Sequence, residues 1–184
     1  VWRNLLDRCE TGLGEGRGSP SDKKLLTEVR TALHTLGDPW TDELAYGPIH
    51  ADYFPDNVLF DHGEVSGVID FYFGCVDALV YDLAIALSAW GFDAEGEAIT
   101  GAISAFRGGY ESVRPLSGAE SATLPRLGQA AAIRFTATRL HDRIFHDPDT
   151  LVTPKDPSVF LRRLSYWRQQ SPLPSDAPHP PLPR

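Results

Sequence analysis

The turn between two short apolar runs constrains the fold of this chain more than any other feature of its sequence. Val58–Phe60 and Val65–Ile69 are separated by Asp61-His62-Gly63-Glu64, a segment of strong turn formers. Short apolar runs joined by such a turn are typical of an antiparallel β-hairpin. We therefore expect one small hairpin at this place.

The remaining apolar residues favour helices. Ser21 is expected to cap a helix that reaches Leu36, because Leu25, Val29, Ala32, Leu33 and Leu36 share one face. Gly37 and Pro39 follow as end signals. Asp82 is expected to open an almost wholly apolar helix, Leu83–Trp90. Further helices are expected over Ile99–Tyr110, about Glu120–Phe145, and within Pro154–Gln170. The predicted class is α+β, mainly helical.

Three regions are expected along the chain. Residues 1–20 are interpreted as a linker and a remnant that enters the lobe, since the glycine-rich stretch G-L-G-E-G-R-G at 12–18 fits no phosphate-binding loop. Residues 21–170 are predicted to form one lobe with its own core. Residues 171–184 contain six prolines and are expected to be disordered.

Composition excludes some partners. Lys and Arg total 17 and Asp and Glu total 25, giving a net charge of −8, which argues against a nucleic-acid partner. No apolar run approaches the ~18 residues of a membrane span. The two cysteines lie outside metal-ligand spacings, and we expect reduced thiols in a cytoplasmic protein.

The expected hairpin brings polar side chains together at its base. An antiparallel pairing of Val58 with Ile69 sets Asn57 opposite Asp70. One carboxylate and one neutral oxygen are too few for Ca²⁺ but suit Mg²⁺ held jointly with a phosphorylated substrate. Asp52, in the preceding loop, could accept the proton of an attacking hydroxyl.

His50 is expected to brace this loop through hydrogen bonds. Together these residues predict the catalytic half of a phosphoryl-transfer site. The competing interpretation is an Asx-rich turn without chemistry.

Two segments of this region, H-A-D-Y-F-P-D-N (50–57) and I-D-F (69–71), resemble the catalytic loop and metal-binding Asp of the aminoglycoside phosphotransferase family of protein-kinase-like small-molecule kinases. Within it the chain is most similar to the bacterial homoserine kinase branch, through Y-D-L-A-I-A-L-S-A-W-G-F, V-R-P-L-S-G-A-E and L-V-T-P-K-D-P. The resemblance covers about residues 45–168. It implies ATP-dependent phosphorylation of L-homoserine in threonine synthesis, with Asp52 as base and Asn57 and Asp70 as Mg²⁺ ligands.

The chain departs from that family in one respect. Such kinases have an N-terminal lobe with a loop over the phosphates and a strand Lys that binds them. The three lysines here, Lys23, Lys24 and Lys155, lack that strand context. The chain begins with Val1 and contains no Met. We therefore expect a C-terminal lobe without its N-terminal lobe, inactive alone.

The residues that bind the acceptor stay open. A zwitterion such as homoserine needs a cation and an anion, and Arg134 and Arg139 are candidates for its carboxylate, with Asp77 or Asp142 for its ammonium. Ion pairing on a helix surface also explains the two arginines. An aminoglycoside, choline or sugar acceptor, and an inactive partner-binding lobe, are the alternatives.

Overall fold

The computed structural model describes residues 2–151 and 153–170. The helices of this part are α1 (Trp2–Gly14), α2 (Pro20–Leu36), α3 (Leu79–Trp90), α4 (Thr100–Val113), α5 (Gly118–Ile144) and α6 (Ser158–Gln170). The strands are β1 (Tyr46–Ile49), β2 (Val58–Asp61), β3 (Glu64–Val68) and β4 (Cys75–Ala78), with single 3₁₀ turns at Pro55–Asn57 and Phe71–Phe73. The tail predicted to be disordered, 171–184, lies outside the described residues.

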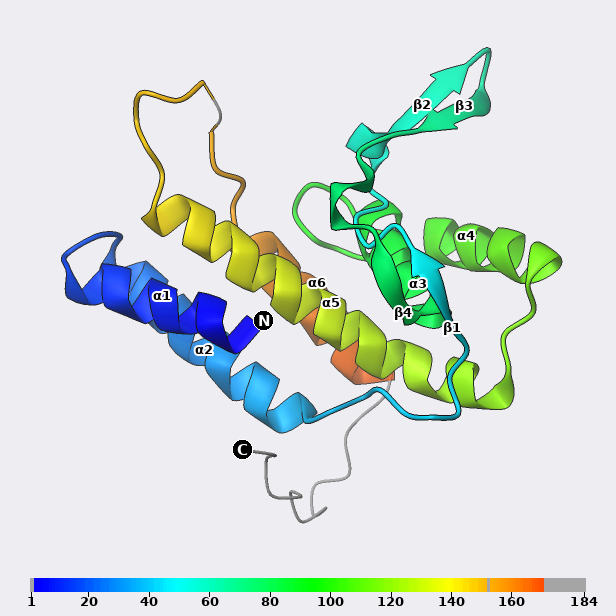
Figure 1. Cartoon of the computed structure of the whole chain (residues 1–184), viewed down its shortest axis with the longest axis horizontal. Coiled ribbons are helices and arrows are strands. Elements are labelled where there is room, and N and C mark those ends of the chain that lie inside the picture. The colour runs from blue at the N-terminus through cyan, green and yellow to red at the C-terminus, as the bar shows by residue number, and fades with distance from the viewer. Residues whose placement is uncertain (1, 152, 171–184) are drawn as a thin grey trace.

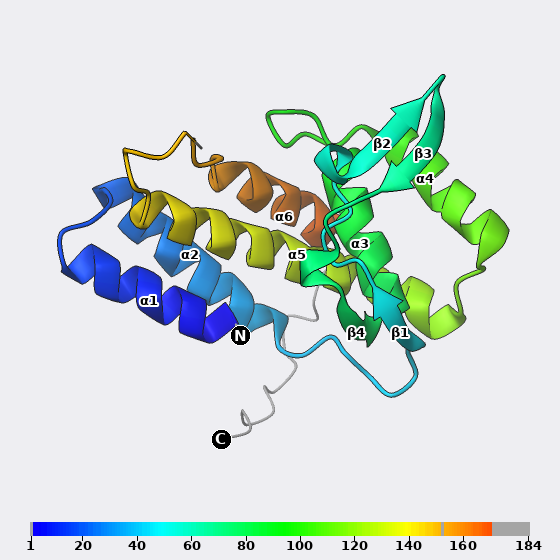
Figure 2. The same cartoon turned by 45° about the horizontal axis from the view of Figure 1, so that its top comes forward.

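Helix α5 forms the centre of the molecule and packs against α1, α2, α3 and α6 (Figures 1 and 2). Small residues allow this close approach. Ala130, Ala131 and Ala132 are fully buried, and a Cβ at Gly128 would lie only 2.2 Å from the Trp167 ring of α6. Within the described residues, no helix is long and apolar enough to cross a membrane.

The expected helix after the glycine-rich stretch is present, but its first residue differs from the prediction. Ser19, not Ser21, caps α2, since its hydroxyl accepts a hydrogen bond from the backbone N–H of Asp22. The Asp22 carboxylate accepts from the Ser19 N–H at 2.8 Å, which completes a capping box. Pro20 then occupies the first turn, where its missing N–H costs nothing. Gly37, with φ of 65°, ends the helix as predicted.

Much of the segment interpreted as a linker and a remnant is helical, since α1 covers Trp2–Gly14. Leu6, Cys9 and Leu13 of α1 are buried at a spacing of three to four residues and pack on the common core. Only the short connection after Gly14 remains a loop. The apolar stripe of α1 ends where the glycine-rich stretch begins.

The hairpin is confirmed, but its predicted register was wrong by one residue. Val58 pairs with Val68 rather than Ile69, and a register shift follows between Leu59 and Phe60. His62 and Gly63 both have positive φ, 49° and 86°, which is the signature of a tight two-residue turn. Such a turn displaces the pairing from the one centred on Gly63 and Glu64.

A second antiparallel pair, β1 with β4, was not predicted from the sequence. Ile49 pairs with Cys75 and Tyr46 pairs with Ala78. Both strands are short, and β1 contains Gly47 and Pro48, which are rare inside strands. Ile49 and Cys75 are 26 positions apart, so no local turn signal marks the pair. The pairing matters because β1 leads directly into His50 and β4 leads directly into α3.

Candidate active site

The loop between β1 and β2 is held in an unusual backbone conformation by a carboxylate. Ala51 has φ of 62°, a region that costs a residue with a Cβ about 1–3 kcal/mol. The Asp82 carboxylate, in the first turn of α3, accepts the backbone N–H of His50 at 3.0 Å and of Ala51 at 2.8 Å. Hydrogen bonds to a charged acceptor contribute about 1.5–3 kcal/mol each, enough to offset this strain.

His50 joins this loop to the end of the hairpin. Its Nδ1 accepts the backbone N–H of Asp52 at 3.2 Å, so its Nε2 carries the proton and donates to the carbonyl of Ile69 at 2.9 Å. The ring also contacts the ring of Phe71 in a tilted arrangement, with centroids 4.6 Å apart. His50 therefore fixes the distance between the Asp52 loop and the residue before Asp70.

Asp52 is partly buried at the centre of the site. Its Oδ2 accepts a hydrogen bond from the amide nitrogen of Asn57 at 3.1 Å, and the same nitrogen donates to the Asp52 carbonyl at 2.8 Å. Burial raises the pKa of the Asp52 carboxyl above its ordinary value, and Asp70 raises it further. The charge of Arg134 and the hydrogen bond from Asn57 act in the opposite direction.

Asn57 and Asp70 reach the same cavity as Asp52, although they are not directly opposed across the hairpin. This cavity has a volume of about 280 Å³. Asp70 follows β3 with φ of 62° and ψ of 55°, a turn that the predicted register did not contain. The amide nitrogen of Asn57 is engaged by Asp52, so its amide oxygen is the atom that could bind a metal. A carboxylate and an amide oxygen fit Mg²⁺, which prefers oxygen ligands and few of them from protein.

The two arginines predicted from the sequence have different environments. Arg134 donates to the Ala51 carbonyl at 2.8 Å and lies over the Phe135 ring at 4.8 Å. It also lines a second cavity beside Asp52, of about 620 Å³, together with Asp142. Arg139 lines the smaller cavity instead, with its guanidinium over the Phe160 ring at 4.5 Å.

Asp77 is engaged elsewhere. Its Oδ1 accepts the indole N–H of Trp40 at 2.7 Å and the backbone N–H of Ala78. It is not among the residues that line the two cavities next to Asp52. The structure thus brings Asp52, Asn57, Asp70 and Arg139 together and leaves Asp77 with β4.

Sequence reasoning missed two residues of this region. The sequence predicts Asp82 only as the start of a helix and shows Lys155 only as a lysine without strand context. Lys155 lines the smaller cavity, and its Nζ lies 2.9 Å from Asp56 Oδ2. The single available signal was the position of each residue within the family-like segments Y-D-L-A and L-V-T-P-K-D-P.

The sequence of this chain is similar to those of known phosphotransferases. Residues 1–116 match the model of the phosphotransferase enzyme family, APH. A homoserine kinase of Gluconobacter oxydans is 52% identical over 173 residues, which cover 93% of this chain and 53% of that protein. Homoserine kinases of Rhizobium rhizogenes and Phenylobacterium zucineum are 44% and 46% identical, over 91% and 88% of this chain and 51% and 53% of their own lengths. The chain therefore spans about half the length of the curated relatives it matches.

Proposed function

Because this chain belongs to the phosphotransferase enzyme family, we propose that it carries the catalytic residues of a kinase that transfers the γ-phosphoryl group of ATP to the hydroxyl of L-homoserine. The observation that supports this most is Asp52, hydrogen-bonded to Asn57 in a cavity shared with Asp70. The names of the relatives support homoserine as the acceptor.

Asp52 is the proposed general base. It accepts the proton of the acceptor hydroxyl while the oxygen of that hydroxyl bonds to the γ-phosphorus, and ADP leaves with the electron pair of the broken P–O bond. Asn57 holds one oxygen of the Asp52 carboxylate, which leaves the other free to face the acceptor. The loop conformation fixed by Asp82 and His50 keeps this geometry before substrate binds.

Asn57 and Asp70 are the proposed ligands of Mg²⁺, which would neutralise charge on the phosphate oxygens. Within the described residues, no group of three or more His, Cys, Asp or Glu side chains is arranged to hold a metal. Two protein oxygens suit an ion that enters with the nucleotide and takes the rest of its ligands from phosphate and water.

The lobe itself is the proposed C-terminal half of a protein-kinase-like fold. Neither Lys23 nor Lys24, both in α2, has the strand context of a phosphate-binding lysine. We propose that the part that covers the nucleotide lies outside the region that the relatives share with this chain. Activity is therefore best measured in a chimera in which this chain replaces the segment it matches in the Gluconobacter oxydans protein.

The test is a coupled ADP-release assay of that chimera with L-homoserine, choline and kanamycin. We expect turnover with L-homoserine at a kcat/KM well above that with the other two. Asp52→Asn should lower kcat by about 10²–10⁴-fold, the usual contribution of a positioned base, with little change in KM for ATP. Preference for choline or kanamycin would contradict the proposed acceptor, and near-normal kcat in Asp52→Asn would contradict the proposed base.

A further inference from the structure

Two cations from distant parts of the chain face the cavity that contains Asp52. Arg139 comes from α5, and Lys155 from the loop that leads into α6. Asp56, next to Asn57 in the catalytic loop, is the ion-pair partner of Lys155 at 2.9 Å. Both side chains of this pair are well exposed, at 61% and 71%, so the pair contributes little to stability and opens easily.

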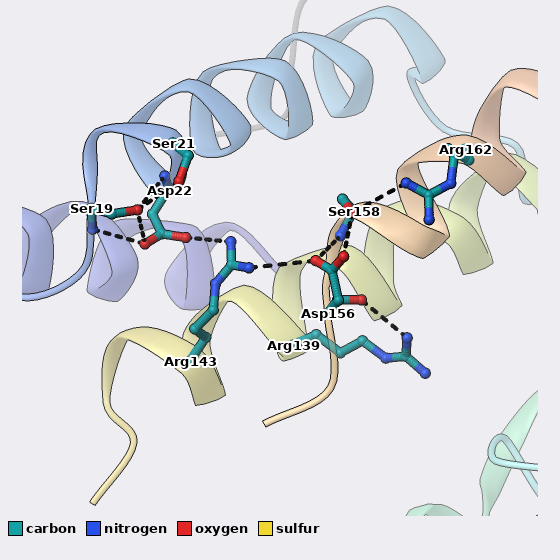
Figure 3. A network of polar contacts seen from close by, with 8 residues as sticks. All are labelled: Ser19, Ser21, Asp22, Arg139, Arg143, Asp156, Ser158 and Arg162. Carbon is teal, nitrogen blue, oxygen red and sulfur yellow. Dashed lines mark hydrogen bonds and ion pairs between the residues drawn. The ribbon is translucent and has the colours of Figure 1, made fainter. Parts of the chain in front are cut away.

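Arg139 has unused hydrogen-bonding capacity. Its guanidinium donates to the backbone carbonyl of Asp156 at 3.3 Å, and in the described part of the chain no carboxylate oxygen lies within 4.0 Å of it. Figure 3 shows the contrast with Arg143, one turn later on α5, which pairs with both Asp22 and Asp156. Burial lowers the pKa of Arg139. A guanidinium has five N–H donors, so a partly desolvated Arg139 favours an anion in the cavity.

Arg134 is less suited to that role. Its guanidinium donates to the Ala51 carbonyl and stacks on Phe135, which ties it to the catalytic loop. It acts on Asp52 through that loop and through its charge. Of the two arginines, Arg139 is the one that lines the cavity shared by Asn57 and Asp70, whereas Arg134 lines the larger cavity.

Resting on the proposed function, we propose that Arg139 and Lys155 bind the carboxylate of the acceptor amino acid and that Asp56 binds its ammonium group. An acceptor with both charges can replace the Lys155–Asp56 pair by one ion pair to each partner. The cavity of about 280 Å³ suits a small acceptor, at the lower end of ligand pockets. The two cations at its wall match a carboxylate, which homoserine has and choline and aminoglycosides lack, so these residues also favour this acceptor.

The test uses acceptors that carry one charge each. In the chimera, L-homoserine is compared with 4-hydroxybutyrate, which lacks the ammonium, and 3-aminopropan-1-ol, which lacks the carboxylate, as substrates or competitive inhibitors. Arg139→Gln and Lys155→Gln should raise KM or Ki about 10- to 100-fold for L-homoserine and 4-hydroxybutyrate, which carry a carboxylate. The same constant for 3-aminopropan-1-ol should change by less than about twofold. Asp56→Asn should raise KM or Ki for L-homoserine and 3-aminopropan-1-ol, which carry an ammonium group, and leave the constant for 4-hydroxybutyrate nearly unchanged. Arg107→Gln on α4 and Lys24→Gln on α2 are matched controls that should change none of these constants.

The outcomes separate the two proposals. If Arg139→Gln and Lys155→Gln change KM for ATP, or lower kcat equally with all three acceptors, the cations contact nucleotide phosphate and the inference is overturned. Unchanged homoserine kinetics in Arg139→Gln overturn it too, while leaving the proposed function intact. A chimera that phosphorylates choline in place of homoserine removes the proposed function and this inference with it. If the chimera is inactive, saturation-transfer NMR of 4-hydroxybutyrate on this chain decides: a signal lost in Arg139→Gln supports the site, and an equal signal overturns it.

Discussion

At the scale of single residues, the site depends on two backbone positions that ordinary residues avoid. Ala51 and Asp70 both have φ of 62°. Each such position costs about 1–3 kcal/mol and persists only where neighbours hold it. Ala51 is held from both sides, with its N–H bound by Asp82 and its carbonyl bound by Arg134. Arg134 is thus a positioning residue whose charge also acts on Asp52.

The first prediction concerns that charge. Burial raises the pKa of Asp52, and Arg134 opposes the rise. Arg134→Gln should therefore raise this pKa further. Since the proposed base works only when ionised, the acid limb of the kcat/KM profile should lie at higher pH in the Arg134→Gln chimera than in the unsubstituted chimera. A pH–rate profile measures this, with Arg107→Gln as the control. An acid limb that stays in place would show that Arg134 does not tune Asp52.

At the scale of elements, the β2–β3 hairpin returns the chain to Asn57, so that Asp70 lies near it in space although 13 positions separate them in sequence. The Ile69 N–H donates to the Asn57 carbonyl at 3.0 Å, so the two strands are still joined at the base of the hairpin. A register shift in the pair leaves this base in place. The proposed metal ligands are therefore set by the base of the hairpin and not by its tip.

The second prediction is that Asn57 and Asp70 act through one ion. Asn57→Ala or Asp70→Ala should raise the Mg²⁺ concentration for half-maximal activity of the chimera. The double variant should be little worse than Asp70→Ala alone, because residues that act as a unit are not additive. A Mg²⁺ titration of the four proteins measures this. Additive losses with an unchanged Mg²⁺ requirement would contradict a shared ion.

A second group of polar contacts joins three elements away from the cavity. Asp22 at the start of α2 pairs with Arg143 at the end of α5, and Arg143 reaches Asp156 at 3.4 Å in the loop before α6 (Figure 3). Burial opposes the ionisation of Asp22, but hydrogen bonds from Ser19 and the charge of Arg143 outweigh it and lower its pKa. This loop also carries Lys155, so the network helps to place it.

The third prediction follows from that pKa. A carboxyl whose folded-state pKa lies below its unfolded value of about 3.9 stabilises the fold above that pH and loses the contribution as pH falls through the folded value. Asp22→Asn should lower the free energy of unfolding by about 1–3 kcal/mol at pH 7, and the difference from wild type should shrink below about pH 4. Urea unfolding at several pH values measures this.

The control for that experiment is Asp7→Asn. Asp7 pairs with Arg30 on the surface with its side chain 62% exposed, so its loss should cost little at any pH. Equal effects of the two substitutions would contradict a special role for Asp22.

At the scale of the whole molecule, the helices bury their apolar faces around α5 while the hairpin projects away from them (Figure 1). The hairpin and the residues after it expose a group of large apolar side chains: Leu59, Phe60, Val65, Ile69, Phe71, Tyr72, Phe73 and Val76. Both small sheets have two strands, so their edges are unpaired. Such surfaces favour association with another chain or with another part of the same protein.

The fourth prediction is that this chain, by itself, self-associates through that surface. Sedimentation velocity at about 10–100 μM should show species larger than a monomer, and Phe60→Glu with Val65→Lys should shift the distribution toward the monomer. Val113→Lys is the control, because Val113 is 87% exposed on α4, away from the hairpin. A monomer throughout this range would contradict the prediction.

The sequence by itself determined the features that depend on local chemistry. Apolar spacing predicted α2 to α6 within a few residues, and the turn formers predicted the hairpin, because both signals lie within one or two turns of chain. The motif at residues 50–57 and Asp70 pointed to the candidate site and its family for the same reason. Local signals failed in two places. The cap of α2 is Ser19 and not Ser21, with Pro20 in the first turn. The tight turn at His62 and Gly63 shifts the strand pairing from the predicted register by one or two residues.

Only the tertiary structure decided which distant residues complete the site. Asp82 reaches His50 and Ala51 because β1 pairs with β4, and Lys155, in the loop between α5 and α6, contacts Asp56 across 99 positions. The tertiary structure also distinguishes Arg134 from Arg139. Both are arginines of α5, but they line different cavities. Contacts of this kind depend on packing between elements, for which a single sequence carries no periodic signal.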